Sequence, residues 1–151
     1  MRTLPHLAAA AALLLALAGC SSSMPAPTAD QVVADLTSKI SSVQPGEVVT
    51  AENDPNKLLG RPNGYTSAMA FTDSRVPTDP FPPAPGSIEA GGKVEVFESE
   101  DTAQARVEYI QQVTKGAPML GEYIYRSGPV VVRVASGLTP DQAADFESAL
   151  G

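Results

Sequence analysis

The single cysteine of the chain, Cys20, comes close after an apolar run, and this arrangement indicates which part of the sequence forms the folded domain. Residues 7–17 consist only of Ala and Leu, follow the basic side chain of Arg2 and end at small residues. A short positive region, an apolar core of about 7–15 residues and a small-residue exit are typical of a secretory signal peptide. The run is too short to span a bilayer, which takes roughly 20 residues, although it would also suit an ordinary buried helix. We therefore expect residues 1–19 to be a signal peptide that is removed.

The last four residues of this segment, Leu17-Ala18-Gly19-Cys20, resemble the lipobox of bacterial lipoproteins at every position. The resemblance implies that the Cys20 thiol receives a diacylglyceryl group, that the chain is cut between Gly19 and Cys20, and that Cys20 then carries acyl chains such as palmitate. Two or more acyl chains hold a protein stably on a membrane, whereas one binds only marginally. The alternative is an ordinary secretory cleavage that leaves a free thiol.

The charge of the chain favours the lipid as the membrane anchor. The formal net charge is −7, and anionic lipid surfaces attract basic segments rather than acidic ones. Residues 20–28 are rich in Ser, Pro and Ala and are predicted to form a lipidated flexible tether. We expect residues 29–151 to form a single domain on the extracytoplasmic face of the cell membrane.

Composition excludes several kinds of chemistry from that domain. The only histidine, His6, lies in the segment that is removed, and the only thiol is the one expected to be acylated. Without an imidazole or a free thiol, the domain cannot use Ser-His-Asp or Cys-His catalysis. It also lacks the usual ligands of zinc and haem, so we expect no metal and no cofactor. The acidic balance argues against nucleic acid, which requires a basic face.

Apolar periodicity predicts three helices and four main strands. Two Thr-x-x-Gln capping boxes, at Thr28 and Thr139, open the first and last helices. The predicted helices are 29–42, 101–115 and one that starts near Pro140, and the predicted strands are 65–72, 93–97, 120–126 and 130–135. A short strand at 48–50 and one or two helical turns within 53–60 are also expected.

The clearest hairpin joins the last two strands at Ser127-Gly128. A two-residue turn there predicts four cross-strand pairs: Tyr125 with Val130, Tyr123 with Val132, Ile124 with Val131, and Glu122 with Arg133. The tyrosines and their partners should form the core side of the sheet. Ile124 and Val131 lie on the other, semi-apolar side, which is either covered by the N-terminal helix or contacts a partner.

These elements predict an α+β fold with a four-stranded, antiparallel-rich sheet, two helices on one face and an additional N-terminal helix. Strands 93–97 and 130–135 are expected in the centre. The order β, β, α, β, β, α equals a ferredoxin-like order with its last strand moved to the front. A simple antiparallel sheet with another strand order is the alternative.

Two further stretches are candidate sites. Glu95, Glu98, Glu100 and Asp101 could supply oxygen ligands to Ca²⁺, but acids at a helix N-terminus are the simpler interpretation because they favour the helix dipole. Residues 73–85 contain five prolines and are predicted to be an exposed loop with polyproline character around Phe81. A partner with an aromatic groove could bind residues 76–85.

The whole chain looks like the small lipoproteins of high-GC Gram-positive bacteria, a resemblance that implies no activity. Our first hypothesis is a lipid-anchored, non-enzymatic domain that binds another envelope protein through Phe81, or through Ile124 and Val131. A small-ligand or ion-binding lipoprotein is the first alternative. A histidine-free hydrolase that uses carboxylates is the second.

Mass spectrometry of the native protein tests the anchor directly. We expect a chain that begins at Cys20 and carries the added mass of its acyl groups. An intact Met1, or an unmodified thiol on Cys20, would contradict the lipobox interpretation.

Overall fold

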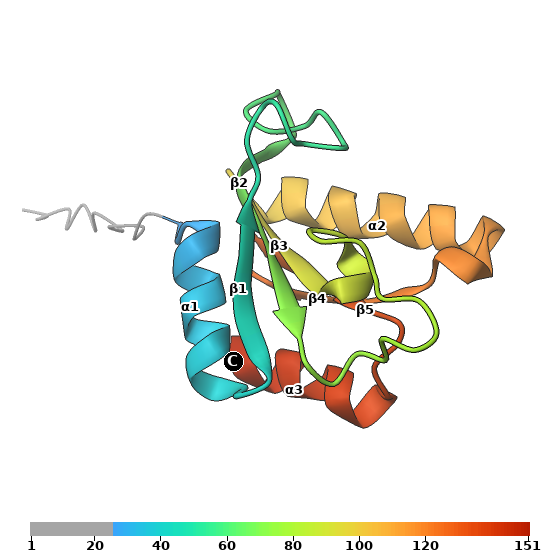
Figure 1. Cartoon of the computed structure of the whole chain (residues 1–151). Coiled ribbons are helices and arrows are strands. Elements are labelled where there is room, and N and C mark those ends of the chain that lie inside the picture. The colour runs from blue at the N-terminus through green and yellow to red at the C-terminus, as the bar shows by residue number, and fades with distance from the viewer. Residues whose placement is uncertain (1–25) are drawn as a thin grey trace, which may run out of the picture.

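The computed structural model describes residues 26–151 (Figure 1). The predicted signal peptide 1–19, including Gly19, and the lipidation site Cys20 lie outside the described residues. The elements, in chain order, are α1 (Ala29–Lys39), β1 (Val43–Val48), β2 (Tyr65–Asp73), the short helix η1 (Ile88–Ala90), β3 (Gly91–Phe97), α2 (Glu100–Gly116), the short helix η2 (Pro118–Leu120), β4 (Glu122–Ser127), β5 (Val130–Ala135) and α3 (Pro140–Leu150). Within the described part of the chain, no helix has the length and apolar character needed to cross a membrane.

The strands form one antiparallel sheet in the order β1-β2-β3-β5-β4, which confirms the α+β class. The prediction of four strands is wrong, because β1 adds a fifth strand at one edge. The permuted ferredoxin-like arrangement is not confirmed. As expected, β3 and β5 are neighbours inside the sheet, flanked by β2 and β4.

The sequence concealed β1 because Pro45-Gly46 resembled the end of a helix. The expected helix over 29–42 stops at Lys39, and β1 begins before the short strand expected at 48–50. Proline is tolerated in an edge strand because one side of that strand needs no ladder hydrogen bond. Gly46 lies so close to β2 that a Cβ atom would sit 2.8 Å from the Ala70 carbonyl oxygen. Pro45 therefore suits the edge position of β1, and Gly46 suits its close approach to β2.

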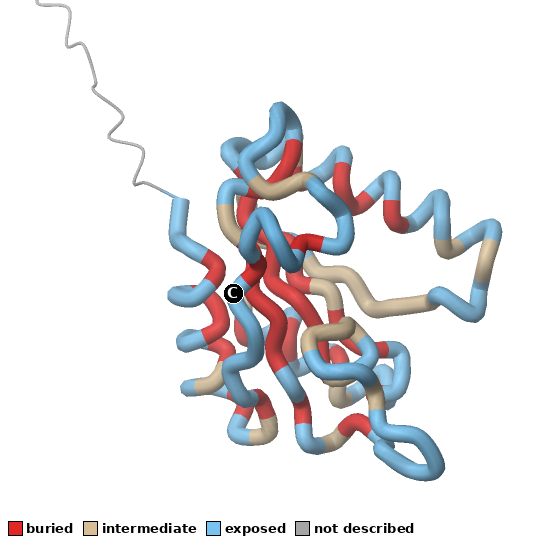
Figure 2. The backbone as a smooth tube through the Cα atoms, turned by 45° about the horizontal axis from the view of Figure 1, so that its top comes forward, coloured by how far each residue is buried: buried red, intermediate tan, exposed pale blue. Residues whose placement is uncertain are grey.

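Helices cover both faces of the sheet, so the prediction of helices on one face is wrong. α1 and α3 share one core with β3 and β5, which includes Leu36, Phe146, Val94, Val96 and Val132. α2 covers the opposite face, in a second core that includes Ala103, Val107, Phe97 and Val131. Figure 2 shows the buried residues gathered in the strands and on the inner sides of the helices.

The face that carries Ile124 and Val131 is covered by α2 and not, as expected, by the N-terminal helix. α1 instead joins α3 on the other face, where the two helices contact one another. The central strands β3 and β5 have buried side chains on both faces, apolar toward α1 and α3 and partly charged toward α2, and nothing local in the sequence specifies which helix packs on which side. This is why the sequence left the assignment of the helices open to error.

The β4–β5 hairpin is shifted by two residues from its predicted register. Ser127 pairs with Val130 and Ile124 pairs with Arg133, so the turn is Gly128-Pro129. Proline has no N–H for the ladder and therefore takes a turn position, next to a glycine with φ of 52°. A shift of two preserves the faces, since side chains alternate with period two. Tyr123 and Tyr125 accordingly pack with the α1–α3 core as predicted.

β2 does not alternate along its whole length. Its pairing with β3 is irregular between Tyr65 and Ser67, which is where a bulge inserts one extra residue. Met69 and Phe71 therefore face the α1–α3 core, whereas Tyr65 faces α2 and packs edge-on against Phe97 at 6.1 Å. A regular strand would place Tyr65, Met69 and Phe71 on one face, and the extra residue moves Tyr65 to the other.

Gly92 of β3 tests the tight packing beneath Phe71. A Cβ atom there would lie 2.3 Å from the Phe71 ring and 2.2 Å from the Arg133 carbonyl oxygen. We expect Gly92→Ala to lower the free energy of unfolding by about 1–3 kcal/mol, the usual cost of overpacking, in urea titrations. Gly116→Ala is the control because nothing lies within 4 Å of its Cβ position, and it should be neutral or stabilising by at most about 1 kcal/mol. Equal effects of the two changes would contradict this account.

Candidate functional site

A buried carboxylate, Glu95 of β3, lies at the centre of the face that α2 covers. Its exposed fraction is 0%. Arg106 of α2 donates to both of its oxygens, from Nε to Oε2 at 2.9 Å and from Nη2 to Oε1 at 3.1 Å. Arg133 of the neighbouring strand β5 donates from Nη1 to Oε1 at 3.1 Å. One carboxylate therefore joins the helix to two adjacent strands through charge-assisted hydrogen bonds.

The network continues to the edge of the sheet. Arg133 also binds Glu122 of β4, with Nη2 2.8 Å from Oε1, and the Glu122 side chain is almost fully buried. Glu122 and Arg133 were expected directly opposite one another. They are instead diagonal neighbours, and their long side chains still meet.

Lys93 of β3 adds a third cation to the same face. It is 5% exposed and lies directly opposite Arg133 in the ladder. Burial lowers the pKa of Lys93, and the nearby charge of Glu95 opposes that shift only in part. Among residues 26–151, Lys93 has neither a hydrogen bond from its side chain nor a carboxylate within 4.0 Å. The site thus contains a largely buried lysine whose ammonium group keeps some contact with solvent and has no direct partner within residues 26–151.

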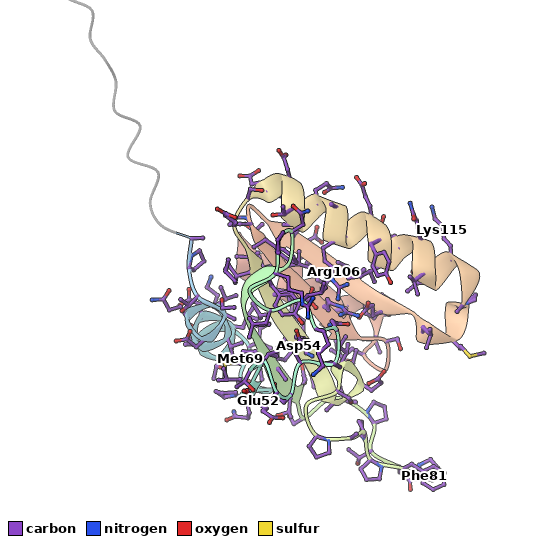
Figure 3. The ribbon with its side chains drawn as sticks, turned by 90° about the horizontal axis from the view of Figure 1, so that it is seen from above. Glu52, Asp54, Met69, Phe81, Arg106 and Lys115 are labelled. Carbon is purple, nitrogen blue, oxygen red and sulfur yellow. The ribbon has the colours of Figure 1, made fainter. Side chains whose placement is uncertain are left out.

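Asp54 organises the loop between β1 and β2 beside this network (Figure 3). It is buried, and its oxygens accept hydrogen bonds from the backbone N–H groups of Asn56, Leu58 and Leu59 at 2.7–2.9 Å. The hydroxyl of Tyr65 donates to the same carboxylate. Burial alone would raise the pKa of Asp54, but these hydrogen bonds outweigh it and lower the pKa to about 2. The helical turns expected within 53–60 are therefore replaced by turns wound around Asp54.

A pocket of about 290 Å³ opens beside the network, between α2, η1 and the β4–β5 edge. Its polar wall contains Asn56, Arg106, Glu122 and Arg133, and its apolar wall contains Ile110, Val113 and Leu120. A second hollow of about 330 Å³ lies on the other side of Arg106. The two hollows share Asn56, Arg106 and Tyr109, and the guanidinium carbon of Arg106 lies 5.7 Å from the Tyr109 ring centroid.

The structure separates the four acids that the sequence grouped as a possible Ca²⁺ site. Glu95 is buried in the arginine network, whereas Glu98, Glu100 and Asp101 are exposed around the start of α2, where Ser99 caps the helix. No group of three His, Cys, Asp or Glu side chains that could hold a metal ion occurs within the described range 26–151. The simpler interpretation, acids that favour the helix dipole, fits the three exposed residues.

The predicted partner contacts differ in their exposure to solvent. Phe81 is 85% exposed at the tip of the proline-rich loop (Figure 3). Val131 is fully buried beneath α2, and Ile124 packs against the same core, so neither presents a free surface to a partner. The proposed contact through that face of the sheet is therefore withdrawn.

Sequence reasoning missed Arg106, Arg133 as a partner of Glu95, and Lys93. One signal was available for Arg106: it occupies the position three residues after Ala103 and four before Ile110, on the buried stripe of the helix. A charge in that position points to a buried partner.

The chain matches no protein-family model, no curated protein and no solved structure in the comparisons made with each. The functional argument therefore rests on the geometry of the chain itself.

A matched pair of methionine substitutions tests the charge assignment. Arg106→Met leaves Glu95 short of its main partner and should cost about 3–5 kcal/mol of stability, the usual cost of breaking a buried ion pair. Lys93→Met removes a buried charge that has no direct partner and should stabilise the domain by about 1 kcal/mol or more at pH 7. Denaturant unfolding at matched pH measures both changes.

The pH dependence gives the same test an internal check. Because burial lowers the pKa of Lys93 below its ordinary value of 10.5, the unfolded chain holds this proton more tightly than the folded chain. Wild-type stability should therefore rise relative to Lys93→Met as pH increases toward 10.5, and the gap between them should narrow. A Lys93→Met variant that is destabilised by as much as Arg106→Met would refute the assignment.

Proposed function

We propose that this chain is a lipid-anchored, extracytoplasmic domain without catalytic activity, which binds another envelope protein through its proline-rich loop. The observation that carries the proposal is that the sequence has a lipobox-like Cys20 while Phe81 is exposed on the side of the domain opposite the start of α1. The described chain enters α1 at one end of the molecule, whereas the loop projects from the far end, as all three views indicate (Figures 1, 2 and 3). A domain held by its N-terminal tether can therefore point this loop away from the membrane.

The composition of the loop suits recognition by a groove lined with aromatic side chains. Five prolines surround Phe81, and most residues from 77 to 85 are exposed. Proline-rich segments bind such grooves with reduced loss of conformational entropy, because each proline ring fixes φ. Residues 79–81 form a bend in the structure, which places Phe81 at a corner of the loop and not in the expected polyproline conformation. We infer that the partner contributes the groove and that Phe81 supplies the largest apolar contact.

The carboxylates of the domain favour binding over hydrolysis. Glycoside hydrolysis takes two carboxylates that face one another across a substrate, one of them as an acid. Both oxygens of Glu95 accept hydrogen bonds from arginines, and Glu122 is bound to Arg133. These acids serve as partners for buried cations, which supports the non-enzymatic proposal over the hydrolase alternative.

Small-ligand binding is the second candidate function, and the pocket beside Arg106 favours it. Ligand sites are concave, mostly apolar and equipped with a few polar groups that fix orientation. The pocket combines one apolar wall with two arginines and an asparagine. This function requires neither the anchor nor the loop.

Photo-crosslinking in intact cells tests the proposed partner contact. With a crosslinker placed at residue 79, wild type should capture a defined envelope protein, and Phe81→Ala should reduce the yield at least tenfold. Met119→Ala is the matched control because Met119 is 90% exposed on a different surface, so its yield should equal that of wild type. Equal yields from wild type and Phe81→Ala would refute the contact.

A further inference from the structure

We propose that the pocket beside Arg106 binds an amphiphilic carboxylate, a small molecule in which one carboxylate is joined to a short apolar chain. This inference deepens the second candidate function, small-ligand binding, and rests on it. It is independent of the lipid anchor and of the Phe81 loop.

The polar end of the site is a guanidinium group with an unused side. Arg106 is nine-tenths buried, and Glu95 occupies its Nε and Nη2 atoms. Within residues 26–151, its Nη1 atom makes no hydrogen bond, although the side chain lines both hollows. Asn56 also lines both hollows and offers a side-chain amide at the same junction. A carboxylate placed there would satisfy a buried cationic donor by a charge-assisted hydrogen bond.

The charges beneath the pocket favour an anion. Lys93, Arg106 and Arg133 converge on this face, while only Glu95 and Glu122 form ion pairs with them. Lys93 and Arg133 stand directly opposite one another, and like charges in that position repel. A ligand carboxylate would reduce this repulsion and would add to the negative charges of Glu95, Glu122 and Asp54.

Two other carboxylates lie near enough to oppose an anion. The oxygens of Asp54 are already covered by the hydroxyl of Tyr65 and three backbone N–H groups. Glu89 lines the pocket, but it is exposed and therefore screened by water. Neither carboxylate contacts Arg106 directly. Neither acid therefore competes with a ligand carboxylate for Arg106.

The apolar end of the site is formed by the second half of α2 and by η2. Ile110, Val113 and Leu120 line one wall, and Val113 and Leu120 remain exposed. Tyr109 and Met119 extend the same exposed apolar surface. A hydrocarbon chain would cover these side chains and remove their area from water.

The size of the pocket limits the length of that chain. At about 290 Å³ it lies just below the range of about 300–1,000 Å³ typical of ligand sites, which favours a medium chain over a long lipid. A neutral hydrocarbon would leave the Nη1 atom of Arg106 without a ligand partner. An organic cation would meet two arginines, and Glu122 is already bound to Arg133, which leaves only the exposed Glu89 of the lining to attract it. The combination of walls therefore selects an anion with an apolar tail.

Calorimetry with a matched ligand series tests the proposal. The protein is the expected mature chain, residues 20–151, with Cys20→Ser. It carries neither the acyl groups nor the apolar segment 7–17, and it needs no detergent, which would compete for the site. Octanoate should bind at least tenfold more tightly than 1-octanol or octylammonium, and acetate should not bind measurably. Equal binding of all three eight-carbon probes would overturn the carboxylate class but leave small-ligand binding intact. No binding by any probe would overturn both.

One rim variant and one matched control test whether the ligand binds in this pocket, without disturbing the buried ion pairs. Val113→Asp puts a negative charge on the apolar wall and should weaken octanoate binding at least tenfold. Val48→Asp is the control, since Val48 is an exposed valine on β1 outside the pocket, and its affinity should match that of the parent. Circular dichroism confirms that both remain folded. Octanoate binding that is unchanged in Val113→Asp would overturn the assignment to this pocket.

Discussion

The carboxylate of Glu95, sealed from water between a helix and a sheet, is the constraint on which the arrangement of this domain depends. An ionised group in such a place costs several kcal/mol unless opposite charges meet it with good geometry. Arg106 and Arg133 provide that geometry from two different layers. Apolar contacts such as those of Val107 have no directional preference, and they would allow α2 to slide or rotate. The ion pairs permit only one docking position, so the pocket walls that α2 carries are held in a fixed place relative to the sheet.

The same network distinguishes the two faces of the sheet. The face under α1 and α3 is filled by aliphatic and aromatic side chains, with Phe71 stacked on Phe146 at 5.3 Å. The face under α2 divides its area between a small apolar cluster and buried charges. Buried charges add less to stability than well-packed apolar groups of the same volume. Their presence beside a pocket is easier to understand as a requirement of recognition than as a means of stabilising the fold.

Much of the local structure could be predicted from the sequence, whereas the relations between elements could not. Capping boxes and alternation located three helices and four strands, because these signals act within a few residues. The edge strand β1 was not predicted because Pro45-Gly46 is a strong local signal for the end of an element. Only the pairing with β2 makes these residues part of a strand. The candidate site was not predicted for a related reason. Lys93, Arg106 and Asn56 lie on different elements, and no local signal indicates that the fold brings them to the same region. Phe81 was located correctly because a run of prolines excludes regular structure without any help from the rest of the fold.

The irregularity in β2 has a consequence for how this domain can vary. Because one extra residue lies between Tyr65 and Ser67, the Tyr65 ring faces α2, on the opposite side of the sheet from Met69 and Phe71. The hydroxyl of Tyr65 donates a hydrogen bond to Asp54 in the loop between β1 and β2. The one extra residue in β2 therefore connects this loop to the sheet. Side-chain identities along β2 can change while this connection persists, but a change in the number of residues there would sever it. In related chains, the length of this strand should therefore vary less than its composition.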